Sequence, residues 1–458
     1  REKSVHISRV ILFMVLVLHG QTVELIVHEE KNPTIMAAQM VEMYLDSLLT
    51  TEEALNHSYV LASFHGEAPI RVAYMKIDEA IGIDTIIISG NNEISKNTSF
   101  RLLAPIMHSI PRLETMQKVG WIESSYKFFQ NSIDFVYART QNGHLATLVK
   151  VIPAFESNFS GILGASQGTG GIWKTTGEID IHLENIWQSA STSQLYWQRQ
   201  NEKSQVLSFY HEEPAPLGIP FGLRIKFDQE LRDGEYVYGA QEGTILTGGT
   251  RYGKWSFGGS SININPTETG ALIGLSKHKS SVISVGLEKD SRNNRWTPFN
   301  GNYWDVTVTL GNQTEDNKKD LQGHWLISTG SYWPITSRFS AHTRLLTTGR
   351  WVQDGAIHKG QKIRYGGVSG LRGYRDDQFI SNSILIPTFE LLATAGNNLQ
   401  LLGFIEGAIQ KEYQPYPIGF GFGLTQVSIS TILSTTIGFG RGDPLSAAKL
   451  HIKFSSRL

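Results

Sequence analysis

The stretch Trp304-Asp305-Val306-Thr307-Val308-Thr309-Leu310 alternates apolar side chains with polar ones. Successive side chains of an extended strand point to opposite faces, so this strand has one apolar face and one polar face. The same period of two recurs throughout residues 156–458, where helical periods are almost absent. Further clear examples are Glu178–Glu184, Leu223–Asp228 and Lys449–Phe454. The pattern predicts an all-β region that makes up the second part of the chain.

Alternation alone fits both a soluble sandwich and a membrane barrel. The connections favour the barrel, because short ones alternate with long polar ones, which we place at Gly311–Gln322 and Thr347–Ser381. The polar faces also carry charges of both signs, as a wet lumen would. We expect about sixteen antiparallel strands at roughly 19 residues per strand and connection, which suits spanning strands of about 9–11 residues. An even number of strands can close without leaving an edge in hydrocarbon.

Composition excludes several classes of function. The net charge of the 458 residues is −1, which gives no basic surface for nucleic acid. The chain has no Cys, so disulfides, thiolate catalysis and Cys-ligated zinc are excluded. The 14 His are scattered without an H-E-x-x-H motif, and no metal site or cofactor is predicted.

The N-terminus has the pattern of a secretory signal peptide, which we place at residues 1–20. The apolar run Val10–Leu18 follows basic residues and is shorter than the roughly 20 residues that a spanning helix needs. A buried N-terminal strand is the alternative interpretation. No other segment reaches the length of a transmembrane helix, so entry into a membrane would require a barrel.

Residues 22–153 mix helical and strand patterns. In residues 22–77, helical spacing predicts a helix within Asn32–Leu49, and two strands are expected within Tyr59–Ile77. Residues 81–153 read as one compact β-α-α-β-β unit. Its expected elements are a strand at Ile83–Ser89, helices at Ser99–Met107 and Leu113–Asn131, and strands at Asp134–Arg139 and Leu145–Ile152, joined by the turn Gln141-Asn142-Gly143.

Four sequence motifs follow one another along the expected helices and strands. Ile86–Asn91 opens the second N-terminal unit. Asp290-Ser291-Arg292-Asn293 and Pro298-Phe299-Asn300-Gly301 lie between the expected strands eight and nine. Gly366-Gly367-Val368-Ser369-Gly370-Leu371-Arg372-Gly373-Tyr374 lies between strands eleven and twelve, and Phe404-Ile405-Glu406-Gly407 lies in strand thirteen.

Together these motifs resemble those of the BamA/TamA/two-partner-secretion superfamily, in which POTRA domains precede a sixteen-stranded outer-membrane barrel. The resemblance implies a degenerate POTRA-like unit at 22–77, a POTRA domain at 81–153 in the periplasm, and the barrel at 156–458. It also implies that the sixth extracellular loop folds into the lumen, where Arg372 pairs with Glu406 beside Phe404.

Such a pair is strong enough to hold a loop. A guanidinium binds a carboxylate through two hydrogen bonds, and Gly370 and Gly373 are expected to allow tight turns beside it. Breaking a buried pair by removing one partner costs about 3–5 kcal/mol, and a wet lumen reduces this figure. The pair offers no catalytic chemistry, and we predict that the protein is not an enzyme.

The resemblance implies a function in inserting β-strand-rich clients into the outer membrane or passing them across it. The POTRA domains would receive an unfolded client by β-augmentation. A weak seam would lie between the first barrel strand, about Phe159–Gln167, and the last, about Ala447–Ser455. Expected partners are client proteins, outer-membrane lipids and periplasmic or lipoprotein subunits. Two alternatives stay open: an exporter of one secreted protein, and a surface barrel without assembly activity.

Two glycine-containing motifs have structural interpretations. Gly164-Ala165-Ser166-Gln167-Gly168 matches the nucleophile elbow of hydrolases, but the elbow needs a following helix and Trp173–Ile186 reads as a strand. Gly419–Gly423 alternates Gly with bulky residues and has no helix after it. This spacing indicates that a strand bends or that another element approaches the barrel wall.

Overall fold

The computed structural model describes most of the chain. The described residues are 22–27, 34–37, 40–41, 44, 58–65, 71–77, 82–90, 93–109, 113–129, 133–139, 145–167, 173–367, 370–396 and 398–458. The predicted signal peptide lies outside them. The chain forms two compact units, of which the second holds Ala154–Leu458 together with Glu93–Arg101 and Glu123–Asn131.

The first N-terminal sheet has four strands in the order β2-β1-β4-β3, with β1 parallel to β4. The strands are β1 (Thr22–Val27), β2 (Thr34–Ala37), β3 (Ser58–His65) and β4 (Arg71–Ile77). The two strands expected within Tyr59–Ile77 are present. The helix expected within Asn32–Leu49 is wrong at Thr34–Ala37, because β2 pairs with β1 and this pairing outweighs the local helical spacing.

The elements of residues 82–151 follow the expected β-α-α-β-β order. They are β5 (Thr85–Ser89), α3 (Lys96–Leu103), η3 (Ala104–Ile106), α4 (Leu113–Ser125), η4 (Lys127–Phe129), β6 (Ile133–Arg139) and β7 (Leu145–Val151). The sheet order is β5-β7-β6, with β5 parallel and β6 antiparallel to β7. Strand β6 is therefore an edge strand. Among the described residues, no helix is both long enough and apolar enough to cross a membrane.

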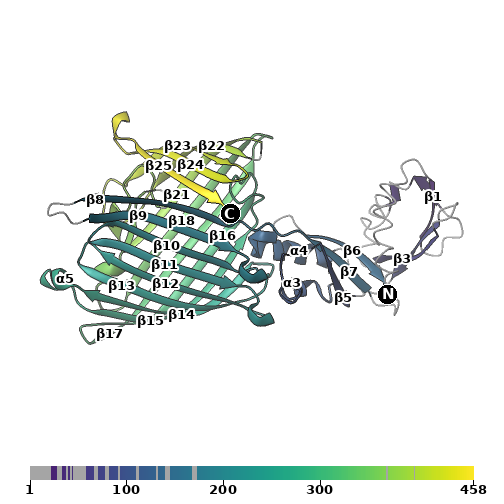
Figure 1. Ribbon diagram of the computed structural model, residues 1–458, viewed down its shortest axis with the longest axis horizontal. Helices are drawn as coiled ribbons and strands as arrows, with labels where there is room; N and C mark the ends of the chain where they lie inside the picture. Colours follow the sequence, from purple (N-terminus) through teal and green to yellow (C-terminus); the bar gives the residue numbers. More distant parts are fainter. Residues whose placement is uncertain are drawn as a thin grey trace. The chain divides into compact units, whose positions relative to one another are not determined.

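Sixteen antiparallel strands close into a barrel, which confirms the predicted fold (Figure 1). The first eight are β8 (Asn158–Gln167), β9 (Trp173–Glu184), β10 (Thr192–Asn201), β11 (Ser204–Glu213), β12 (Gly222–Arg232), β13 (Tyr236–Leu246), β14 (Lys254–Pro266) and β15 (His278–Asp290). The others are β16 (Gly301–Glu315), β17 (Lys318–Pro334), β18 (Phe339–Val352), β21 (Ser383–Ala395), β22 (Leu399–Gly407), β23 (Ile418–Val427), β24 (Thr431–Gly440) and β25 (Lys449–Arg457).

The polarity of the barrel wall is the reverse of that of a soluble protein. Its buried inner face carries polar side chains, and its exposed outer face carries apolar ones. On β21, Thr388 and Glu390 are buried, whereas Phe389 and Leu391 are 43% and 55% exposed. The apolar side chains of the last strand, β25, are exposed in the same way. An apolar outer belt around a polar interior is the arrangement that hydrocarbon requires of a spanning barrel.

The connections differ from the predicted ones at one place. Strands β16 and β17 are joined by Asp316 and Asn317 alone, both with positive φ, so the long connection expected at Gly311–Gln322 is wrong. The polar residues of Gly311–Gln322 extend β16 and β17 beyond the apolar belt. In that part the side chains do not alternate between apolar and polar, so the sequence pattern does not reveal the strands. The long connection is residues 353–382, which we call the lumen loop. It carries the short paired strands β19 (Ile363–Tyr365) and β20 (Phe379–Ser381).

The barrel closes between its first and last strands, β8 and β25, which lie side by side in Figure 1. Only two residue pairs join them, Phe159 with Ser456 and Asn158 with Arg457. By contrast, ten pairs join β8 to β9 and eight join β24 to β25. Most of the facing edges of β8 and β25 thus have no strand partner in the described structure. We call this junction the seam.

Candidate functional site

The lumen loop is anchored inside the barrel through the predicted Gly366–Tyr374 motif. Leu371 is fully buried in an apolar cluster, together with four other buried residues. These are Tyr365 of the loop, Ile384 and Ile386 of β21, and Ala408. Burial of a leucine side chain contributes about 1.5–3 kcal/mol, which favours this inward position of the loop.

Arg372 lies at the centre of a charge cluster. Its Nη2 atom is 2.8 Å from Oε2 of Glu406, whose side chain is fully buried, and its backbone N–H donates to Oε1 of the same carboxylate. Nη1 lies 2.7 Å from Oε1 of Glu390. The guanidinium stacks on the ring of Phe404 at 3.7 Å. The structure thus brings Arg372, Glu406 and Phe404 together and adds Glu390, which the sequence did not reveal.

Further side chains hold this cluster in place. His342 Nδ1 is 2.7 Å from Oε2 of Glu390, and the His342 ring stacks on Tyr332 with centroids 4.0 Å apart. Thr388 donates to Oε2 of Glu406. Burial alone would lower the pKa of Arg372, but its hydrogen bonds to Glu406 and the charges of both carboxylates raise it above its ordinary value. The arginine therefore stays charged, and we call the group formed by Arg372, Glu406 and Glu390 the electrostatic lock.

Glycines let the loop lie directly against the barrel wall. Gly373 has φ +89°, and a Cβ atom there would overlap the carbonyl oxygen of Phe439 in β24. A Cβ at Gly419 of β23 would overlap the carbonyl oxygen of Arg372. From sequence, Gly419–Gly423 fits either a strand bend or the approach of another element, and the structure shows the approach at Gly419. Gly370 does not have a positive φ, unlike Gly366 and Gly367, so the tight turns occur at those two residues and at Gly373.

Gly419→Ala is expected to push the loop away from the wall, because the new methyl group takes the position of the Arg372 carbonyl. Overpacking of this kind costs about 1–3 kcal/mol, which corresponds to roughly a five- to hundredfold rise in the released loop. Trypsin cleavage at Arg372 in intact membranes measures that release. Gly403→Ala on β22 is the control, since a Cβ there is at ordinary van der Waals distance from its nearest neighbour. Equal cleavage of the two variants would contradict the close approach.

Tyr374, the last motif residue, connects the loop to β23 and to the turn after β24. Its hydroxyl donates to the carbonyl of Ile418 and accepts from the backbone N–H of Arg441, both at 3.1 Å. In the same turn, Asp443 pairs with Lys449 of β25, and this hydrogen bond lowers the pKa of the Asp443 carboxyl. The motif is therefore linked to the turn that leads into the last strand.

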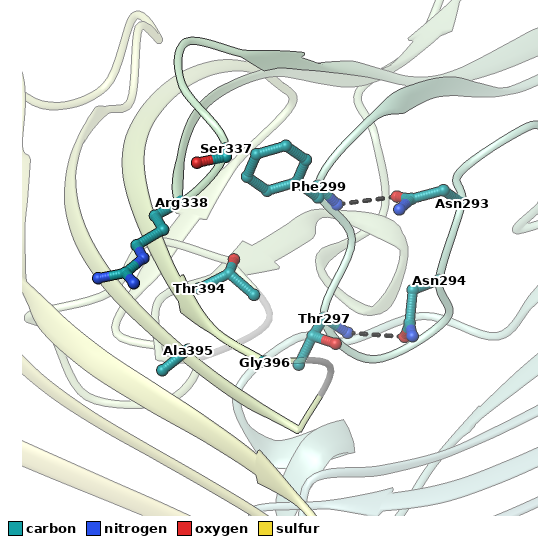
Figure 2. Close-up of a pocket in the computed structure, with 9 residues that line it drawn as sticks. All are labelled: Asn293, Asn294, Thr297, Phe299, Ser337, Arg338, Thr394, Ala395 and Gly396. Atoms are coloured by element: carbon teal, nitrogen blue, oxygen red, sulfur yellow. Dashed lines mark hydrogen bonds between the residues drawn. The ribbon is translucent and has the colours of Figure 1, made fainter.

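The turn motif between β15 and β16 closes one rim of the barrel. Arg292 pairs with Asp290 at 2.6 Å, and Gly301 has φ +108°. The carbonyl of Pro298 accepts a hydrogen bond from Gln400 of β22. A cavity of about 840 Å³ lies at this rim, where Asn293 and Asn294 accept hydrogen bonds from backbone N–H groups of the turn (Figure 2). The other lining residues are Thr297, Phe299, Ser337, Arg338, Thr394, Ala395 and Gly396.

Two aromatic residues join the turn motif to the loop motif. The Arg292 guanidinium lies 5.0 Å from the ring of Tyr303, and Tyr303 lies 6.2 Å from His342. His342 then reaches Arg372 through Glu390. Nothing in the sequence pattern links the two motifs. Inward alternation marks Tyr303 and His342 as lumen residues, but only the register between strands shows that they bridge the motifs.

A second group of buried charges lines the lumen near the start of β8. Glu212, Arg224, Lys254 and Glu288 form a ring of alternating sign, with nitrogen to oxygen distances of 2.5–2.7 Å. They border a polar cavity of about 600 Å³. No group of three or more His, Asp and Glu in the described residues could hold a metal ion. Ser166 lies in β8 and is followed by β9, which excludes a strand-to-helix nucleophile elbow.

A closed sixteen-stranded barrel with an apolar outer belt, a polar lumen and an anchored inner loop is an outer-membrane β-barrel. The Omp85 superfamily domain matches residues 180–409, which is half of the chain, and the chain belongs to the Omp85 superfamily. Members of this family are assembly and transport barrels and not enzymes. The barrel therefore lies in the outer membrane, with the N-terminal region in the periplasm. A comparison with curated protein sequences finds no match.

Solved structures share the fold at low sequence identity. CdiB from Escherichia coli is 13% identical with a TM-score of 0.57, and the match covers 96% of this chain and 90% of that one. CdiB from Acinetobacter baumannii is also 13% identical, with a TM-score of 0.54 and coverage of 98% and 86%. BamA from Haemophilus ducreyi lacking POTRA domains 1–3 is 14% identical, with a TM-score of 0.53 and coverage of 94% and 96%. These likenesses support the fold alone.

Proposed function

We propose that this protein inserts β-strand-rich client proteins into the outer membrane through the seam between β8 and β25. The observation that carries the proposal is the closure of the barrel by two residue pairs. Beyond Phe159, the edge of β8 that faces β25 has no strand partner in the described structure. The edge of β25 that faces β8 likewise has no strand partner before Ser456. Each unpaired backbone group in hydrocarbon costs several kcal/mol, so these edges favour the addition of a client strand.

The remaining contacts across the seam are few and polar. The Leu458 N–H donates to the carbonyl of Ser157 at 2.9 Å, and Arg457 pairs with Glu156 at 2.7 Å. Lys453 reaches across β8 to Asp180 of β9 at 3.0 Å. Exposed ion pairs typically contribute about 0–1 kcal/mol each. A strand that forms a full ladder with β8 gains more than these contacts provide, so the seam can open without nucleotide or metal.

The N-terminal region would deliver the client. We assign residues 22–77 as a degenerate POTRA-like unit and residues 81–153 as a POTRA domain. Both contain sheet edges, including β6 in the second unit, to which an extended client segment can add. Periplasmic or lipoprotein subunits are the partners expected at these domains.

An exporter of one secreted protein is the second candidate. The polar cavity of about 600 Å³ bordered by the charge ring favours it, because a translocating chain needs a hydrated path through the lumen. Export would require the lumen loop to move, whereas insertion requires the seam to open. The two candidates thus use different parts of the same barrel.

Depletion of the protein in its host distinguishes the candidates. Insertion predicts that many outer-membrane barrel proteins decrease together, which quantitative proteomics of outer-membrane fractions would measure. Loss of a single secreted protein, with the other barrels unchanged, would support export instead. If neither fraction changes, the protein is a surface barrel without assembly activity.

A further inference from the structure

The lumen loop has a second set of ion pairs, distant from Arg372. Asp377 lies 2.9 Å from Nη1 of Arg232, the last residue of β12. Lys359, at the start of the loop, lies 2.6 Å from Glu235 in the turn after β12. The Arg364 guanidinium also donates to the hydroxyl of Tyr236 at the start of β13. We call the pairs Arg232–Asp377 and Lys359–Glu235 the β12 anchor.

The β12 anchor and the other anchor of the loop, Arg372 with Glu406, lie on opposite walls of the barrel. In the closed order of sixteen strands, β12 is the fifth and β22 the thirteenth, so seven strands lie between them in either direction. Glu406, the acceptor of Arg372, belongs to β22. Only four residues lie between Arg372 and Asp377, and the loop therefore connects the two walls through a short segment of backbone.

The backbone at Asp377 supports a specific role for its ion pair. Asp377 has φ +54°, in the left-handed region that non-glycine residues rarely adopt, although Asp and Asn tolerate it best. Arg232 is mostly buried, whereas Asp377 is 39% exposed at its side chain. A conformation of this kind persists where neighbouring contacts hold it. Asp377→Asn therefore removes the charge and keeps a residue that suits this backbone.

We infer that the lumen loop is a strut fixed to both walls, in which the β12 anchor positions the loop as a closed plug together with Arg372. With Arg372 alone, the loop would be fixed to one wall, and release of that single anchor would free it. With both anchors, the loop crosses the lumen, and opening a path for solute requires both to release. This role concerns the lumen and holds whether the protein inserts or exports clients.

Ion conductance of the purified full-length protein in planar bilayers tests the strut. The variant Lys359→Gln/Asp377→Asn removes two loop charges and leaves the wall residues intact. Loss of two ion pairs of this kind is expected to raise the open fraction of the protein about tenfold. The control is Lys362→Gln/Asp376→Asn, which makes the same charge changes in the same loop. Neither control residue forms an ion pair in the described part of the chain. The conductance of this control variant should therefore stay at the level of the unmodified protein.

Charge reversal separates positioning from loss of structure. Glu235→Lys alone should raise conductance, and Glu235→Lys/Lys359→Glu should return it to the original level. In the Arg372→Ala background, the rise in conductance caused by loss of the β12 anchor should multiply with the rise caused by Arg372→Ala. The reason is that each anchor stabilises the same closed state. Equal conductance of the anchor and control variants would overturn the strut. Failure of Glu235→Lys/Lys359→Glu to return the conductance to the original level would also overturn the strut. This comparison is the deciding test if Lys359→Gln/Asp377→Asn does not fold.

Discussion

Arg372→Ala is expected to reduce complementation of a depleted strain by at least about tenfold while leaving the barrel folded. The substitution leaves Glu390 and Glu406 facing each other without a cation, and stranding a buried charge costs about 3–5 kcal/mol before the wet lumen reduces it. It also removes the stacking on Phe404. We expect the lumen loop to leave the wall, so that it becomes accessible to protease.

Arg375→Ala is the matched control for this prediction. Arg375 lies in the same loop, is exposed and forms no ion pair in the described residues. It should complement normally. Arg372→Lys should be intermediate, because one ammonium group cannot reproduce the fork that reaches both carboxylates. A change in gel migration between heated and unheated samples shows that each variant still forms a barrel. Normal complementation by folded Arg372→Ala would contradict the lock.

Glu406→Ala should give a similar defect, and the double variant Arg372→Ala/Glu406→Ala should be little worse than either. Removal of both partners leaves Glu390 paired with His342 and no stranded arginine. A double-mutant cycle measures the coupling, and fully additive defects would rule out direct pairing. Because Glu390 shares the arginine, Glu390→Gln should produce a weaker defect of the same kind.

Locking the seam with a disulfide is expected to abolish client insertion. Phe159 and Ser456 are register partners, and antiparallel partners have Cα separations that a disulfide can bridge. The chain has no Cys, so Phe159→Cys/Ser456→Cys introduces the only two thiols. We expect loss of complementation under oxidising conditions and recovery after reduction. The measurement is assembly of outer-membrane proteins before and after addition of a reductant.

A disulfide on the other side of the same strand is the control. Thr431 and Ser456 are partners in the eight-pair ladder between β24 and β25. Thr431→Cys/Ser456→Cys therefore uses the same position in β25 but links strands that are already fully paired. It should leave assembly unchanged in both redox states. An equal effect of the two disulfides would show that general rigidity, and not opening of the seam, is responsible.

The architecture could be predicted from sequence because its signals are local. Alternation along single strands gave the sixteen strands, and the motifs placed the lumen loop between β18 and β21. The proximity of Arg372, Glu406 and Phe404 followed from resemblance to a family. The error at Thr34–Ala37 has a simple cause: apolar residues at helical spacing can equally form a strand when a neighbouring strand pairs with them.

The rest of the site depends on register between strands, which the sequence does not show. Glu390 contacts Arg372 because it is the register partner of Phe404 on β22. His342 is in turn the partner of Glu390 on β18. The β12 anchor joins residues more than a hundred positions apart, and only closure of the barrel places them opposite Glu406. Such contacts are fixed by the whole barrel and not by any one segment.

The central claim, insertion through the seam, is tested most directly by cross-linking a stalled client to the barrel in cells. One photoreactive residue replaces Ile162, which is 74% exposed on β8 beside the seam, and another replaces Gln194, which lines the lumen cavity. Insertion predicts strong client cross-links from position 162 and weak ones from position 194. Cross-links from position 194 alone would contradict insertion and place the client's path through the lumen.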